Sequence, residues 1–233
     1  MFLNGVIKAI NSLPEKPRIA VCKFIVKVVL KKYATIHVEG MENLENAKKP
    51  TIFVCNHLSN SDGLVLTEAL KSVAPTFVAG VKLSGNAFTQ IGLNVVKTTS
   101  IVPNSSDSEG IKRIIKLIKD GESILIFPEG TRSRTGSMIE AKNGIVLIAK
   151  MTKAPIVPLG LYGSEKLLPI NMEGNMESEK FHKADVTISI GEQFTLPKKL
   201  EGQDRKEYSE YATTYLMKKI AALLPEEYRG FYK

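Results

Sequence analysis

The sequence predicts an α/β fold in which a mostly central sheet is flanked by helices on both faces. From residue 33 onward, short apolar runs rich in β-branched residues alternate with longer segments of helical periodicity, and polar turn residues separate them. A chain of 233 residues with 43% hydrophobic residues can also bury one sizeable core. We therefore expect a single α/β domain over residues 33–233, preceded by an N-terminal appendage over residues 1–32.

The appendage carries most of the excess charge. It holds seven Lys or Arg side chains and one acidic residue, Glu15, and so contributes six of the eight net positive charges. Apolar residues fall on one helical face before and after the turn at residues 14–17, at Phe2, Leu3, Val6, Ile7 and Ile10 and then at Val21, Phe24, Ile25, Val28 and Val29. Two basic amphipathic helices are typical of a membrane-surface anchor for anionic lipids, and not of nucleic-acid binding. The alternative is that these faces pack on the domain.

Three further features concern the compartment. No apolar run reaches the roughly 18 to 20 residues needed to cross a bilayer, which predicts a peripheral protein. Cys22 in the appendage and Cys55 in an expected core strand are poorly placed for a disulfide, so we expect the reducing, cytoplasmic face of the cell membrane. The two cysteines and three histidines show no metal-ligand spacing, so no metal is expected.

The expected elements follow in chain order. Strands are predicted at residues 33–38, 51–55, 76–80, 123–127, 156–161 and 186–190. Helices are predicted at residues 63–71, 107–119, 141–151 and 201–224, the second of them capped by Ser106 or Asp107 and stopped by Gly121. The polar stretch at residues 166–183 has no clear period and is expected to form a loop near the membrane or the substrate entrance.

A histidine and an aspartate follow the second strand. His57 comes just after the buried run at residues 51–55, and Asp62 stands five positions later. Ligands in open α/β sheets bind at the carboxyl ends of the strands, so this pair is a candidate base with its orienting partner. The alternative is that Asp62 caps the next helix and that His57 is an ordinary loop residue.

A second polar loop follows the strand at residues 123–127. It contains Glu129, Gly130, Thr131, Arg132, Ser133 and Arg134. Glycine lets the backbone approach a ligand closely, and arginine offers a planar donor fork, so the loop suits an oxyanion such as phosphate. The alternative is a surface turn in which the arginines pair with nearby carboxylates, Glu129 included.

These motifs resemble those of a known family. NHLSNSD at residues 56–62 and FPEGTRS at residues 127–133 resemble motifs of the glycerolipid acyltransferases, and IVPLG at residues 156–160 is similar to their final motif. The likeness covers residues 38–169 and is greatest to the 1-acylglycerol-3-phosphate acyltransferases, which make phosphatidic acid. It implies an acyltransferase domain at residues 33–233 and an acyl-CoA or acyl-ACP co-substrate, with no other cofactor. The acceptor implied is a lysophospholipid.

The resemblance also implies roles for single residues. His57 would be the base and Asp62 its partner, while the loop from Glu129 to Arg134 would bind the acceptor. Glu129 would contact the glycerol backbone or pair with Arg132.

One position departs from the family pattern. Asn104 stands where many members carry an arginine at the end of a middle motif, here TSIVPN at residues 99–104. Lys82 or Lys97 would then supply the missing charge. The departure leaves other acceptors open, namely glycerol 3-phosphate or another lysophospholipid. A non-catalytic phospholipid-binding protein and a hydrolase using Ser59 or Ser61 are the rival classes.

Overall fold

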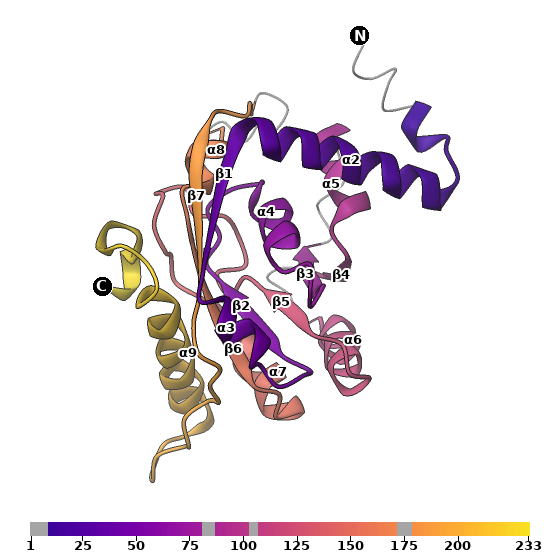
Figure 1. Ribbon diagram of the computed structural model, residues 1–233. Helices are drawn as coiled ribbons and strands as arrows, with labels where there is room; N and C mark the ends of the chain where they lie inside the picture. Colours follow the sequence, from indigo (N-terminus) through magenta and orange to yellow (C-terminus); the bar gives the residue numbers. More distant parts are fainter. Residues whose placement is uncertain (1–8, 81–86, 103–106, 172–178) are drawn as a thin grey trace.

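The computed structural model describes residues 9–80, 87–102, 107–171 and 179–233. Its centre is a seven-stranded sheet in the order β1-β7-β6-β2-β5-β3-β4, with helices packed on both faces (Figure 1). The α/β class with a central, helix-flanked sheet is therefore confirmed.

The elements have the following bounds. The strands are β1 (Ala34–Glu39), β2 (Ile52–Cys55), β3 (Thr76–Gly80), β4 (Thr98–Ile101), β5 (Ile124–Ile126), β6 (Ile156–Tyr162) and β7 (Ala184–Ile190). The helices are α2 (Glu15–Tyr33), α3 (Met41–Glu45), α4 (Asp62–Ala69), α5 (Ala87–Val95), α6 (Ser108–Lys119), α7 (Gly144–Thr152), α8 (Ser164–Leu167) and α9 (Arg205–Ala221). Residues 9–11 are also helical, and two 3-10 turns, Glu226–Tyr228 and Gly230–Tyr232, follow α9.

Strand direction determines which loops meet. Strands β2 to β6 are mutually parallel where they pair, whereas β7 runs antiparallel to β6 and parallel to β1. The loops that follow β2 and β5 therefore leave the sheet at the same end, the carboxyl ends of the parallel strands. Strands β1 and β7 begin at this end, so the C-terminal end of α2, which leads into β1, also lies there.

The core forms two layers because the central strands are apolar on both faces. In β2, Ile52 and Val54 pack with α6, α7 and α9, while Phe53 and Cys55 pack with α2 and α4. Strands buried on both faces are typical of parallel sheets covered by helices. The unbroken apolar run before His57 follows from this burial.

Helix α2 has two apolar sides. It lies along α5 and leads directly into β1, and its buried residues are Cys22, Val26 and Leu30 (Figure 1). Phe24 and Val28, which belong to the face predicted to meet lipid, are 68% and 48% exposed and so are not buried against the domain. A helix that is apolar on most sides can pack one stripe on a domain and leave another uncovered. The expected residues Phe2 to Ile7 lie outside the described part of the chain.

Four elements were not predicted, namely the short helices α3 and α8, strand β4 and helix α5. Strand β4 is an edge strand, and its exposed Thr98 and Ser100 alternate with partly buried residues, so it lacks a continuous apolar run. Helix α5 is nine residues long and apolar, and short apolar segments do not distinguish a helix from a strand. Among the described residues, no helix combines the length and apolarity needed to cross a bilayer.

Candidate active site

His57 and Asp62 form a close pair at the carboxyl end of β2. The Nδ1 atom of His57 lies 2.7 Å from Oδ2 of Asp62, whose side chain is fully buried. The same oxygen accepts backbone N–H groups from Leu58 and Ser59 at 2.7 and 2.9 Å. Asp62 is the first residue of α4, and its carboxylate turns back to the preceding loop, so the interpretation of Asp62 as a helix cap is wrong.

The orientation of the His57 ring follows from these contacts. A carboxylate only accepts hydrogen bonds, so His57 donates from Nδ1 and Nε2 is the nitrogen that can take a proton. The ring stacks on Phe127 with 4.1 Å between ring centroids and 15° between planes, and its side chain is partly exposed. The imidazole is thus held at one face by Phe127 and at Nδ1 by Asp62.

Glu129 joins the two motif loops. Its Oε1 accepts the backbone N–H of His57 and its Oε2 that of Ile139, both at 2.9 Å, and the residue is 1% exposed. The backbone N–H of Ser133 donates to the carbonyl of His57 at 2.8 Å. Both oxygens of Glu129 are engaged by backbone amides, and among the described residues Arg132 forms its ion pair with Glu179 instead. Glu129 therefore positions the His57 loop, and its contact with the glycerol backbone stays a prediction.

Burial also gives Glu129 a distinct pH dependence. Loss of hydration raises the pKa of Glu129 from 4.5 to about 7, although the amides of Ile139 and His57 oppose the shift. Between pH 4.5 and 7 the folded protein holds a proton that the unfolded chain has released, so the free energy of unfolding falls as pH rises.

We expect this loss to reach about 3 kcal/mol relative to Glu129→Gln, which does not titrate. Urea unfolding of both proteins across this pH range measures it. Parallel stability curves for the two proteins would contradict the assignment.

The phosphate-loop residues are placed unevenly. Arg132 is partly buried, and its Nη1 lies 3.4 Å from Oε1 of Glu179. Gly130 has a left-handed backbone with φ of +71°, which favours glycine. Thr131 and Arg134 are exposed, whereas Ser133 is buried.

The candidate cations for the missing arginine have different outcomes. Lys97 directly precedes β4 and so lies at the amino ends of the parallel strands, whereas His57 lies at their carboxyl ends. It pairs with Glu122 at 2.6 Å. The expectation that Lys97 supplies charge to the acceptor is therefore wrong. Lys82 and Asn104 lie outside the described residues.

The two serines of the first motif are buried. The hydroxyl of Ser59 donates to the carbonyl of Leu168 at 2.8 Å and lies 3.0 Å from that of Ser61. Both residues have no exposed surface. A serine nucleophile must reach its substrate, so this arrangement disfavours the hydrolase alternative.

Three functional neighbours were missed by sequence reasoning. Asn56 is buried and holds β2 to β6 through the backbone N–H and carbonyl of Leu161, at 2.8 and 2.7 Å. Asn60 and Glu179 meet beside Arg132. A polar residue directly after an apolar strand can be recognised in the sequence, so Asn56 could have been predicted. Glu179 could not, because no local pattern marks it and its partners lie far away in the chain.

Comparisons with known proteins agree with this geometry. A family model described as Acyltransferase matches residues 35–162. The chain is 32% identical over 157 residues to a chloroplastic 1-acyl-sn-glycerol-3-phosphate acyltransferase of Arabidopsis thaliana, a match that covers 66% of this chain and 43% of that protein. It is 30% identical over 167 residues to the 1-acyl-sn-glycerol-3-phosphate acyltransferase of Bacillus subtilis, covering 70% and 82%. The chain thus spans less than half of the plant relative.

A solved structure has the same fold. The 1-acyl-sn-glycerophosphate (LPA) acyltransferase PlsC of Thermotoga maritima superposes with a TM-score of 0.64 at 21% sequence identity. The superposition covers 95% of this chain and 88% of that one.

Proposed function

Because this chain belongs to the acyltransferase family, we propose that it acylates the free hydroxyl of 1-acylglycerol 3-phosphate, giving phosphatidic acid. The acyl donor is a thioester, either acyl-CoA or acyl-ACP. The observation that carries the proposal is the His57–Asp62 pair at 2.7 Å, joined to the Arg132 loop through Glu129 and Ser133. Acyl-transfer assays on the purified chain, with variants of His57 and Arg132, test it.

The pair supports direct attack by the acceptor. Nε2 of His57 takes the hydroxyl proton as the acceptor oxygen bonds to the thioester carbon, and Asp62 stabilises the resulting imidazolium. When the tetrahedral intermediate collapses, the carbon–sulfur bond breaks and the imidazolium returns the proton to the leaving thiolate. The products are an ester and a free thiol.

Arg132 is the proposed anchor of the acceptor's phosphate. Its loop is fixed to the His57 loop, so a phosphate held by the guanidinium places the free hydroxyl near Nε2. This contribution is one of orientation and not of bond chemistry. Gly130, Thr131, Ser133 and Arg134 complete the loop in this proposal.

We expect Arg132→Ala to raise KM for lysophosphatidic acid by about tenfold or more, because a charge-assisted hydrogen bond contributes about 1.5 to 3 kcal/mol. Initial rates of thiol release against acceptor concentration measure the change. Arg205→Ala is the matched control, since Arg205 is exposed in the first turn of α9 and belongs to none of the predicted motifs. An equal loss of activity with an acceptor that lacks phosphate would contradict the phosphate contact.

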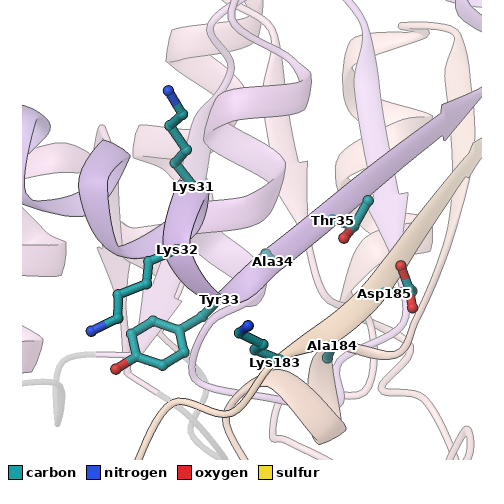
Figure 2. Close-up of a pocket in the computed structure, with 8 residues that line it drawn as sticks. All are labelled: Lys31, Lys32, Tyr33, Ala34, Thr35, Lys183, Ala184 and Asp185. Atoms are coloured by element: carbon teal, nitrogen blue, oxygen red, sulfur yellow. The ribbon is translucent and has the colours of Figure 1, made fainter.

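We also propose peripheral binding to anionic lipid on the cytoplasmic face. The exposed Phe24 and Val28 of α2 lie among exposed lysines. A pocket of about 280 Å³ lies at the end of this helix and is lined in part by Lys31, Lys32 and Lys183, which Figure 2 shows. Basic side chains near an anionic leaflet contribute about 1 kcal/mol each. These lysines lie at the same end of the sheet as the His57 loop, because β1 and β7 begin where β6 ends.

We expect the double change Phe24→Glu and Val28→Glu to abolish most binding to anionic vesicles, since it removes exposed apolar side chains and adds two negative charges. Vesicle co-sedimentation measures the bound fraction. Leu200→Glu is the control, because Leu200 is 55% exposed and precedes the first turn of α9, away from α2. Unchanged sedimentation of the double variant would refute the anchor.

A further inference from the structure

Glu179 occupies the side of Arg132 to which the proposed function assigns the acceptor's phosphate. Building on that function, we propose that Glu179 is a specificity-determining residue. Its carboxylate competes with the acceptor for Arg132 and so lowers the affinity for every phosphate head group. The effect is largest for a phosphate monoester, which carries more negative charge than a phosphodiester.

The contacts of Glu179 form an anion site that the protein fills itself. Its side chain is 3% exposed. Oε2 accepts from Nδ2 of Asn60 at 2.5 Å, and Oε1 lies 3.3 Å from the backbone nitrogen of Asn171 and 3.4 Å from Nη1 of Arg132. These donors come from three separate segments, after β2, after β5 and after α8, and they converge on one carboxylate.

The contact with Arg132 is the longest of the three. It uses one guanidinium nitrogen at 3.4 Å, whereas paired arginine–phosphate bonds are bidentate and about 2.7 to 2.9 Å long. A phosphate can therefore make better bonds to this guanidinium than Glu179 does. The structure thus leaves the guanidinium only partly satisfied by its own carboxylate.

The charge of the ligand determines how strongly Glu179 opposes its binding. Replacing one bound anion by another is favourable only when the newcomer binds the donors more strongly. A phosphate monoester carries about −1.5 to −2 at pH 7, whereas a phosphodiester carries a single charge, the same as Glu179. Repulsion by Glu179 therefore penalises the monoester more than the phosphodiester, so Glu179 limits the preference of Arg132 for the more highly charged ligand.

The test is Glu179→Gln, which keeps the shape of the side chain and removes its charge. Binding of inorganic phosphate to the full-length chain is measured by isothermal titration calorimetry at pH 8. We expect Kd to fall by about tenfold, the effect of one nearby charge. In acyl transfer, the preference for lysophosphatidic acid over lysophosphatidylcholine should grow, because the more negative head group gains more from the loss of the Glu179 charge. Combining the change with Arg132→Ala should abolish the gain in phosphate affinity.

Two further proteins make the outcome decisive. Glu140→Gln, in the same loop as Arg132 and exposed, controls for a general change of charge. Should Glu179→Gln fail to fold, Glu179→Ser repeats the test, because it removes the charge and leaves room for water. Unchanged or weaker phosphate binding overturns the proposal and makes Glu179 a mere support of Arg132. Absence of acyl transfer by the wild type would instead refute the proposed function, since phosphate binding is measured independently of turnover.

Discussion

Acyl transfer by His57→Ala is expected to be about 100- to 10,000-fold slower than by the wild type, the range that a positioned general base provides. The methyl group cannot take the acceptor's proton, while the phosphate loop stays in place. Glu129 and Ser133 hold that loop through the backbone N–H and carbonyl of residue 57, and alanine retains both. The loss should therefore appear in kcat, with KM for lysophosphatidic acid little changed. Thiol release from acyl-CoA follows the rate.

His37→Ala is the matched control for this experiment. His37 lies on β1, is exposed, and faces Asp185 at 3.4 Å. It thus resembles His57 in chemistry but not in position. Full activity of His57→Ala with every lysophospholipid tried would show that the pair is not catalytic.

Asp62→Asn is expected to lower kcat by about 100-fold, in the lower part of the range for acid–base assistance, with little change in stability. The amides of Leu58 and Ser59 require an acceptor at this position, so the asparagine should keep its oxygen where Oδ2 now lies. His57 then retains its orientation but loses the negative charge that stabilises its imidazolium. Rates of thiol release and thermal unfolding, measured together, separate the two effects.

Asp62→Ala provides the contrast. It leaves the amides of Leu58 and Ser59 buried without that acceptor, at a cost of about 1 to 3 kcal/mol each. We expect it to lower both kcat and the melting temperature. Equal melting temperatures for the two variants would contradict the role of these amides, and wild-type turnover by Asp62→Asn would refute the charge argument.

The sequence predicted the elements that have strong local signals. Strand β3 has the expected bounds, and β2 begins only one residue late, because their apolar runs end at clear turn residues. Helix α6 begins after Asp107, whose Oδ1 accepts the Gly110 amide at 2.8 Å, as the capping pattern predicted. The edge strand β4 and the short helix α5 lack such signals, and only their packing against β3 and α2 defines them.

The site was predictable where its residues are close in sequence. His57 and Asp62 are five positions apart, and the strand–loop–helix geometry brings them together without help from elsewhere. The roles of Glu129 and Glu179 depend on contacts across 72 and 119 positions, to His57 and Asn60 respectively. No local pattern reports such a contact. The buried stripe of α2, formed by Cys22, Val26 and Leu30, was not predicted for the same reason, because the packing partner determines which side of an apolar helix is buried.

The opposite directions of β6 and β7 bring the last turn of α2 and the His57 loop out of the sheet on one side. Under the proposed function, an acceptor can approach sideways from a leaflet and meet the base while its hydrocarbon tail stays embedded. The enzyme then avoids extracting that tail into water, which costs about 0.8 kcal/mol for each CH₂ group. The relative direction of these two strands thus removes a free-energy cost that would increase with the length of the hydrocarbon tail.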